Sequence, residues 1–156
     1  MTLISRLHTL LTPLLHPMGL RIVRILMEKD RNLQVMIERL DYTPLNMDYC
    51  VQASKVISDA LDETDPIKES YSLEVTSPGS DRPLLTPEDF QHFTGSMIQG
   101  TLLRDKGRKV KGMILRADDY GFDMTVIQRS SKQENVTMTL LYDDISHVKL
   151  HPNYKF

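Results

Sequence analysis

The residues best placed for covalent chemistry in this sequence are Ser77 and Ser80, two serines of a Ser-Pro-Gly-Ser segment that follows a strand-like run. A serine at the end of a strand is a hydrolase nucleophile when it lies in a G-x-S-x-G elbow and a helix behind it supplies an oxyanion N–H group. Here the elbow spacing is missing, and prolines follow the segment in place of a helix. The segment therefore does not predict a serine hydrolase.

The histidines and the paired acids do not supply a catalytic set either. No pair among the 5 histidines forms the H-E-x-x-H motif of a zinc hydrolase, since Val follows His147 in the one pair that is four residues apart, His147 and His151, and no histidine lies beside the single cysteine, Cys50. Asp118-Asp119 and Asp143-Asp144 are adjacent residues, and neighbours on a strand point to opposite faces, which does not suit an acid–base dyad. One cysteine cannot form an internal disulfide. We predict no enzyme activity, no metal site and no cofactor.

A basic run from Arg104 to Arg116 is the strongest charge feature of a chain whose formal net charge is -2. On a hairpin, its first cations would gather around one turn; they are Arg104, Lys106, Arg108, Lys109 and Lys111. Such a tip binds phosphate backbones through charge without reading bases. Lysines also blunt the edge of a sheet with no ligand involved, and the spacing leaves both interpretations open. Aromatic residues are few, which disfavours recognition of stacked bases.

The first half of the chain shows helical and strand patterns in a defined order. Apolar residues at helical spacing predict an opening helix that ends near Leu15. Two β-rich runs, 20–27 and 33–40, flank a polar turn and predict a hairpin. In the second run we expect one face to carry Leu33, Val35 and Ile37 and the other to carry Gln34, Met36 and Glu38. A second helix that begins after Asn46, its expected N-cap, and a strand at 71–75 follow. The order αββαβ predicts a two-layer sandwich with both helices on one face of a small sheet.

Each of the two expected helices carries one apolar stripe. In the first helix the stripe consists of Leu3, Leu7, Leu10, Leu14 and Leu15. In the second helix the expected buried residues are Met47, Cys50, Val51, Ser54, Ile57 and Leu61. Polar residues between the leucines of the first helix do not fit a signal sequence or a membrane span. We therefore expect a soluble, cytoplasmic protein with no membrane partner.

The pattern changes in the second half of the chain. Thr86-Pro-Glu-Asp89 combines an N-cap residue, a proline at the first helical position and an acid three residues after the cap, which predicts a short helix. Five short strand patterns follow, separated by turn residues. Many short strands in one segment predict a small barrel that closes its own edges. We expect an α+β fold class with two domains, residues 1–82 and 83–156.

The segment YSLEVTSPGSDRPL, residues 71–84, lies at the boundary between the two expected domains. Its first half alternates like a strand, and its prolines and glycine end that strand and restrict the backbone. We interpret it as a stiff interdomain joint formed by Ser77, Pro78, Gly79, Asp81, Arg82 and Pro83. For Arg82 two roles stay open, a structural role in this joint and a contact with RNA.

This segment resembles the most specific motif of the ribosome maturation factor RimP family, Leu-Glu-Val-x-Ser-Pro-Gly-x-Asp-Arg-Pro-Leu. The matching residues are Leu73, Glu74, Val75, Ser77, Pro78, Gly79, Asp81, Arg82, Pro83 and Leu84. The resemblance extends over nearly the whole chain, including the second helix and its acidic end. Two departures are Ser80, where the family usually has leucine, and the YTPLN approach to the second helix, which replaces a Gly-rich one.

The resemblance implies a bacterial factor that binds the free small (30S) ribosomal subunit and assists its late maturation. It implies an α/β N-terminal domain followed by a small SH3-like or Sm-like barrel, which agrees with the organisation inferred from the residues. It also implies contact with rRNA and with a ribosomal protein near the decoding region, without enzymatic turnover or cofactor. We expect a monomer. The alternative is a generic RNA-binding or protein-adaptor module that is not tied to the ribosome.

Overall fold

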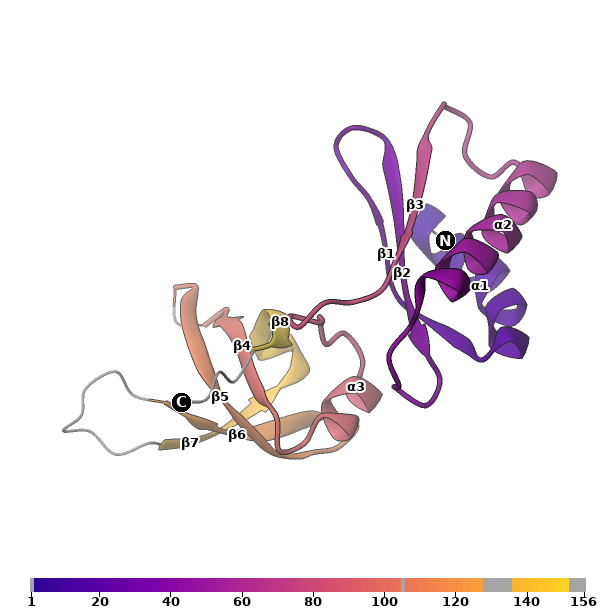
Figure 1. Ribbon diagram of the computed structural model, residues 1–156. Coiled ribbons are helices and arrows are strands. Elements are labelled where there is room, and N and C mark those ends of the chain that lie inside the picture. The colour runs from indigo at the N-terminus through magenta and orange to yellow at the C-terminus, as the bar shows by residue number, and fades with distance from the viewer. Residues whose placement is uncertain (1, 105, 128–135, 152–156) are drawn as a thin grey trace. The chain divides into compact units, whose positions relative to one another are not determined.

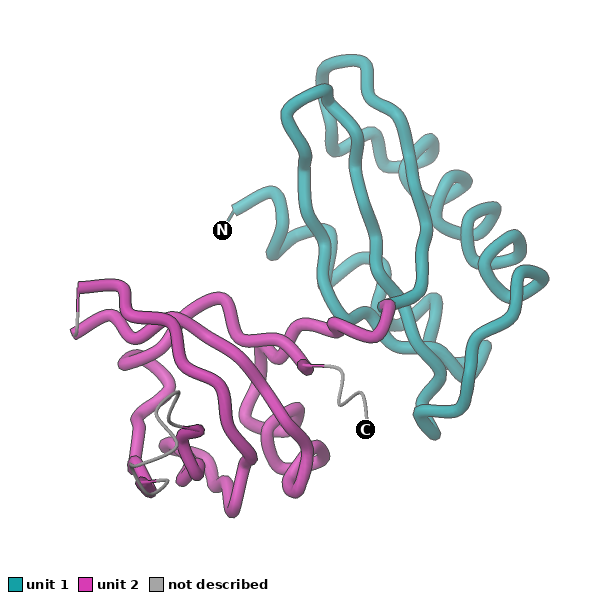
Figure 2. Tube along the Cα trace, turned by 60° about the vertical axis from the view of Figure 1, so that its left-hand side comes forward, with its two compact units in different colours: residues 1–78 teal, residues 79–156 magenta. Residues whose placement is uncertain are grey.

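A computed structural model describes residues 2–104, 106–127 and 136–151. The chain separates into two compact units, residues 1–78 and 79–156 (Figure 2). Helices and strands occur together in both units, which confirms the α+β class. The domain boundary expected between residues 82 and 83 stays a prediction.

The N-terminal unit contains two helices and three strands in the expected order. Its elements are α1 (Leu3–Leu15), the short 3-10 helix η1 (His16–Met18), β1 (Leu20–Met27), β2 (Asn32–Arg39), α2 (Met47–Thr64) and β3 (Ser72–Thr76). The sheet has the order β1-β2-β3, in which β1 and β2 are antiparallel and β2 and β3 are parallel. Both helices lie on the same face of this sheet (Figure 1).

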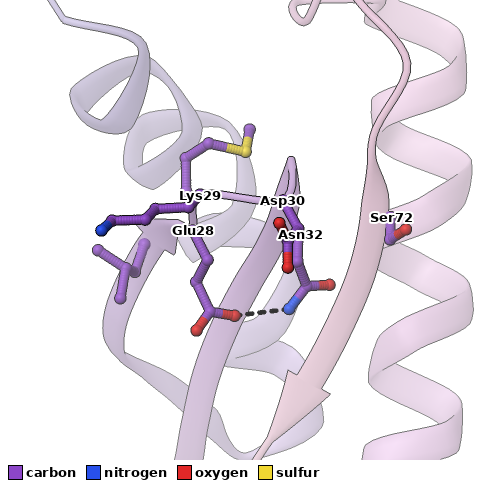
Figure 3. A pocket seen from close by; sticks show the side chains of 7 residues that line it. Glu28, Lys29, Asp30, Asn32 and Ser72 are labelled. Atoms are coloured by element: carbon purple, nitrogen blue, oxygen red, sulfur yellow. Dashed lines mark hydrogen bonds between the residues drawn. The ribbon is translucent and has the colours of Figure 1, made fainter.

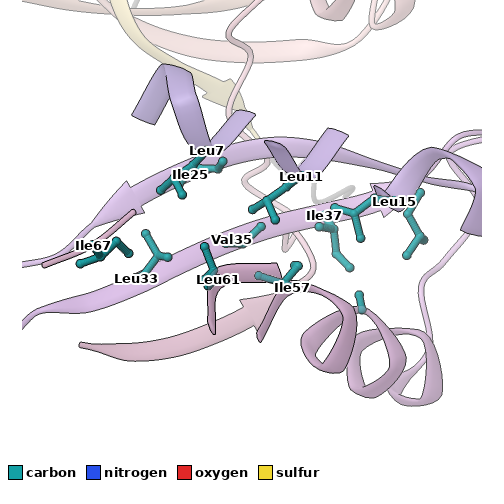
Figure 4. Packing of buried hydrophobic residues seen from close by; sticks show 12 residues of the cluster. Leu7, Leu11, Leu15, Ile25, Leu33, Val35, Ile37, Ile57, Leu61 and Ile67 are labelled. Carbon is teal, nitrogen blue, oxygen red and sulfur yellow. The ribbon is translucent and has the colours of Figure 1, made fainter. Parts of the chain in front are cut away.

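The core of the N-terminal unit lies between the two helices and the sheet (Figure 4). From α1 it receives Leu7, Leu11 and Leu15, and from β2 it receives Leu33, Val35 and Ile37, all with no exposed surface. Full burial of one such aliphatic side chain stabilises the fold by about 1.5–3 kcal/mol. The alternation expected for the second strand is therefore confirmed, because these three β2 residues share the core face.

The buried rows of the two helices differ from the expected stripes. Leu14 is 38% exposed and its neighbour Leu11 is buried instead. In α2 the buried residues are Ala53, Ile57 and Leu61, whereas Met47 is 76% and Val51 is 62% exposed. The buried residues of α2 follow the spacing i, i+4, i+8, which is a narrow row on one side of a helix. The expected stripe was wider than this row and included residues that face solvent. The predictions that Met47, Val51 and Leu14 are buried were therefore wrong.

The expected helix caps are present. The Asn46 side chain accepts a hydrogen bond from the Tyr49 backbone N–H at 3.1 Å and so caps α2. The Thr86 side chain accepts from the Asp89 N–H at 3.2 Å, and the Asp89 carboxylate accepts in return from the Thr86 N–H. This reciprocal capping box begins the short helix α3 (Pro87–His92).

Five antiparallel strands form the sheet of the C-terminal unit. They are β4 (Met97–Leu102), β5 (Arg108–Ala117), β6 (Gly121–Val126), β7 (Val136–Leu141) and, after the 3-10 helix η2 (Tyr142–Asp144), β8 (Ile145–Leu150). The strand order is β7-β6-β5-β4-β8. Among the residues that the structure describes, no ladder joins β7 to β8, so a closed barrel is not confirmed.

One face of the five-stranded sheet is buried under α3 and the segment before it. Ile98, Ile114 and Met124 have no exposed surface and lie at the centre of this second core. Phe90 of α3 contributes an aromatic cluster, with ring centroids 4.8 Å from Phe122 and 4.9 Å from Tyr142. These spacings are typical of favourable aromatic pairs. The other face of the sheet carries the half-buried and exposed residues of each strand.

At Gly112 the backbones of β5 and β6 approach so closely that no side chain fits. A Cβ atom at this position would lie 1.8 Å from the carbonyl oxygen of Thr125, far inside any van der Waals contact. Gly112 pairs with Val126 in the ladder, so the obstacle is backbone that the sheet itself holds in place. A glycine inside a strand often marks this kind of close approach.

We therefore predict that Gly112→Ala destabilises the C-terminal unit by about 3 kcal/mol or more, because two strands must separate to admit one methyl group. Urea unfolding followed by circular dichroism measures the loss. Met113→Ala, one residue further along β5 and 40% exposed, is the matched control and should change the unfolding free energy by about 0.5 kcal/mol or less. Equal stability of the two variants would contradict the prediction.

Candidate functional site

Arg82 is the most deeply buried charged side chain of the segment 71–84, which carries the expected interdomain joint. It is 4% exposed. Its Nη2 donates to Asp89 Oδ1 at 3.1 Å and its Nη1 donates to the carbonyl oxygen of Pro83 at 2.8 Å. The ring of Phe93 lies 5.0 Å from the guanidinium carbon, within the range of a cation–π contact. Arg82 therefore lies inside the C-terminal unit, and its guanidinium is occupied by groups of that unit.

The carboxylate of Asp89 binds Arg82 and also takes part in the N-terminal cap of α3. While Oδ1 accepts from Arg82, Oδ2 accepts from the backbone N–H groups of Leu85 at 2.8 Å and Thr86 at 3.2 Å. Asp89 is 8% exposed, so these donors replace the water that the charge has lost. The acid that was expected only as a capping residue is thus also the counter-ion of Arg82.

The chain around Arg82 extends the sheet at β8. The Leu150 N–H donates to the Arg82 carbonyl oxygen at 2.8 Å, and the Leu84 N–H donates to the Val148 carbonyl oxygen at 2.9 Å. Between these two bonds, Pro83 forms an isolated antiparallel bridge with Lys149. Proline donates no backbone hydrogen bond, so it fits this short edge segment without leaving a donor unpaired.

The six residues of the expected joint are divided between the two compact units. Ser77 and Pro78 belong to the N-terminal unit, whereas Gly79, Asp81, Arg82 and Pro83 belong to the C-terminal one. Asp81 is held there by an ion pair, with 3.9 Å between its Oδ2 and Lys149 Nζ. Ser80, the departure from the family motif, is exposed. That these residues fix the angle between the units stays a prediction.

The basic candidates do not form a single crowded tip. Arg104 and Lys106 lie in the β4–β5 turn, where Arg104 Nε is 3.2 Å from Asp144 Oδ1. Arg108 begins β5 opposite Leu102, a residue of the buried face. Lys109 and Lys111 lie on the opposite, outer face of β5, beside Thr101 and Gln99 of β4. Of the five basic candidates, Lys109 and Lys111 therefore share the outer face of β5.

Lys149 belongs to the same surface, although it lies outside the basic run 104–116 from which the candidates came. Gln99 pairs with Lys111 on one side and with Lys149 on the other. Residues that pair across a ladder share a face, so both lysines flank Gln99 on the outer face of the sheet. The two lysines are far apart in sequence, and only the strand order β5-β4-β8 makes them neighbours.

The other titratable groups do not converge on a reaction centre. Burial raises the pKa of the Cys50 thiol, which favours the unreactive protonated form. Burial also lowers the pKa of His8, which lies half-buried on α1. Among the described residues, no three His, Cys, Asp or Glu side chains are grouped as metal ligands.

An open pocket lies at the end of the β1–β2 hairpin (Figure 3). Its lining residues are Leu26, Met27, Glu28, Lys29, Asp30, Asn32 and Ser72. The Asn32 amide donates to Glu28 Oε1 at 2.6 Å and to Glu74 Oε1 at 2.9 Å. Both amide hydrogens therefore have partners within the protein, and the arrangement does not resemble a catalytic centre.

Replacing Arg82 by methionine should reveal the structural role of the buried pair. Arg82→Met leaves the Asp89 charge buried without its cation, and we expect the free energy of unfolding to fall by about 3–5 kcal/mol. Adding Asp89→Asn should recover part of this loss, because asparagine is neutral and still offers an oxygen to the cap. Urea denaturation of the two single variants and the double variant measures the coupling.

Arg116→Met is the matched control for this cycle. Arg116 also pairs with aspartates, at 3.6 Å from both Asp118 and Asp123, but its side chain is 70% exposed. Exposed ion pairs contribute about 1 kcal/mol or less, so this variant should stay close to the parent protein. A structural role for Arg82 is contradicted if both arginine variants are equally stable.

The comparison with protein families agrees with the fold of the N-terminal unit. Residues 10–81 match the family model described as the RimP N-terminal domain. The matched range includes the C-terminal part of α1, all three strands of the first sheet, α2 and the segment as far as Asp81. The resemblance inferred from the sequence motifs is thereby confirmed. Over these residues the chain carries a RimP N-terminal domain, the domain of a family of ribosome maturation factors.

Proposed function

We propose that this protein is a non-enzymatic assembly factor that binds the free small (30S) ribosomal subunit and assists its late maturation. The observation that carries the proposal is the match of residues 10–81 to the RimP N-terminal domain. Such a factor acts by binding one conformation of the assembling particle better than its competitors, and it shifts the population by that difference in affinity. It needs binding surfaces and no reaction centre or cofactor.

The distribution of charge supports two kinds of contact. Residues 1–78 contain 8 Lys and Arg and 11 Asp and Glu, a formal charge of -3, whereas residues 79–156 contain 11 and 10, a formal charge of +1. Phosphate backbones are attracted to local positive potential. We therefore assign the rRNA contacts to the C-terminal unit, and contacts with a ribosomal protein near the decoding region to the acidic N-terminal unit.

The candidate phosphate contacts at the β4–β5 turn and on β5 are Arg104, Lys106, Arg108, Lys109 and Lys111. All five are exposed, as contact with a partner requires. Arg82, by contrast, is 4% exposed and has its guanidinium engaged, so its proposed role is structural. An RNA contact by Arg82 would first require this buried pair to separate.

The remaining features of the proposal concern the architecture and the cellular setting. We propose that the C-terminal unit is a small SH3-like barrel, which its single antiparallel sheet of five strands supports, and that the domains span residues 1–82 and 83–156. The described part of the chain has no helix that is both long and apolar enough to span a membrane. The match to the RimP N-terminal domain favours the cytoplasm, where ribosomes are assembled, and we propose that the protein acts there as a monomer.

The proposal predicts selective binding to free small subunits. In a sucrose gradient, the protein should co-sediment with separated small subunits and only weakly with intact ribosomes. A generic RNA-binding or adaptor module would instead bind isolated RNA, small subunits and intact ribosomes to similar extents. Equal binding to subunits and ribosomes, or to neither of them, would overturn the assignment.

The turn cations should contribute to the salt dependence of this binding. Lys106→Glu with Arg108→Glu should weaken subunit binding, and the slope of log affinity against log salt should fall by about 1–2 because two phosphate contacts are lost. Lys55→Glu with Lys68→Glu, at two lysines of the N-terminal unit, is the charge-matched control; the Lys55 side chain is 81% exposed and Lys68 is exposed too. An unchanged slope in the double variant would show that these cations do not contact phosphates.

A further inference from the structure

We propose that RNA backbone binds across the outer face of β5, β4 and β8, and that Asp81 competes with an RNA phosphate for Lys149. Rows of cations and uncharged hydrogen-bonding groups form this face, which we call the lysine face and define as Lys109, Lys111, Gln99, Thr101, Ser146 and Lys149. The inference deepens the proposed function and rests on it, since it names where the rRNA backbone lies. To the basic residues already proposed it adds Lys149, and it adds Asp81 as a carboxylate that weakens RNA binding.

The register of the three strands sets the geometry of the lysine face. One row across the strands is Lys111, Gln99 and Lys149, and in the next row Thr101 pairs with both Lys109 and Ser146. Two strand spacings separate Lys111 from Lys149, about 9.5 Å between backbones, and Lys109 lies about 6.8 Å from Lys111 along β5. The cations are therefore spread over a surface and not stacked at one point, as contacts with successive phosphates require.

A β-bulge at His147 brings β8 into this arrangement. Ser146 and Lys149 are three residues apart, so strict alternation would place them on opposite faces. His147 adopts a left-handed conformation with φ 55°, and the β4–β8 register shifts between Gln99 and Thr101. The extra residue restores Lys149 to the outer face while Val148 stays buried. A bulge commonly re-aims a side chain in this way.

The chemistry of the lysine face suits a phosphate backbone better than bases. Among the described residues, Lys109 and Lys111 form no ion pair with an acidic side chain, so their charge is available to an anion. The Gln99 Oε1 lies 2.9 Å from His151 Nδ1, which leaves the amide hydrogens of Gln99 as the groups it offers outward. No described Phe or Tyr side chain belongs to these outer rows, so bases find no stacking platform.

Asp81 places a carboxylate where this face would hold a phosphate. Its Oδ2 is 3.9 Å from Lys149 Nζ, and the two side chains are 62% and 42% exposed. The next residue is held firmly, because Leu150 donates to the carbonyl oxygen of Arg82 and Asp89 binds its guanidinium. Asp81 therefore stays beside Lys149 when RNA approaches. It neutralises one cation and repels phosphates, which lowers the affinity for RNA in general.

Fluorescence anisotropy with a fluorescein-labelled uridine homopolymer RNA tests the inference in the full-length protein over a series of KCl concentrations. Lys111→Gln with Lys149→Gln should weaken binding, and the slope of log affinity against log salt should fall by about 1.4, the value for two contacts to a single strand. Lys55→Gln with Lys68→Gln, the same change of charge at two lysines of the N-terminal unit, should alter neither quantity. If the lysine variant and the control have equal affinities and equal slopes, the proposal that the lysine face binds RNA is overturned.

Asp81→Asn gives the sharper result, because it should strengthen RNA binding. An exposed ion pair contributes little energy, so the RNA affinity should rise by about two- to fivefold when this pair is removed. The gain should disappear when Lys149→Gln is also present, since the carboxylate acts through that lysine. Unchanged or weaker RNA binding by Asp81→Asn, at an unchanged melting temperature, would overturn the competition.

Co-sedimentation of the same variants with free small subunits separates this inference from the proposed function. If the parent protein binds subunits but the lysine variants bind RNA as the parent does, the lysine face is wrong and the proposed function stands. If the lysine variants lose subunit binding while RNA binding is unchanged, the face binds a protein and the RNA assignment is overturned. If the RNA affinities change as expected but neither the parent protein nor any variant binds subunits, the proposed function is wrong and the lysine face stands.

Discussion

The buried ion pair between Arg82 and Asp89 is the interaction on which the C-terminal unit depends. Both charges are almost entirely removed from solvent, so each depends on the other and on the backbone groups that complete the hydrogen bonds. The same carboxylate begins α3, and α3 carries Phe90 into the second core. One residue pair therefore links the segment that follows the first unit, the short helix and the core beneath the sheet.

The same pair also determines where Asp81 lies on the surface of the unit. Because the backbone of Arg82 and Leu84 is bonded to β8, the side chain next to it, Asp81, lies at the edge of the lysine face. Alternation along an extended segment sends Arg82 inward and Asp81 outward. The Asp-Arg dipeptide thus combines a buried anchor for the fold, Arg82, with an exposed carboxylate, Asp81, that is paired with Lys149.

Local chemistry explains what could be predicted from the sequence. The caps at Asn46 and Thr86 depend on neighbouring residues, and the alternation of β2 depends on one strand, so both were predicted correctly. The exposure of Met47 and Val51 was mispredicted because helical spacing alone leaves open which row faces the sheet. Lys149 was missed because its position depends on strand order and on a bulge, and both are set by contacts between distant parts of the chain. The partnership of Arg82 with Asp89 was missed because the capping box already explained the acid.

The bulge at His147 makes the backbone conformation of β8 matter more than most of its side chains. A substitution on the outer surface alters one contact, whereas straightening the bulge with every residue retained would move all following residues to the opposite face of the strand end. Val148 would then face solvent and Lys149 the core. Removing one residue at the bulge would instead give a regular strand in which Val148 still points inward and Lys149 outward. A lost residue and a lost bulge therefore have opposite consequences for the same surface.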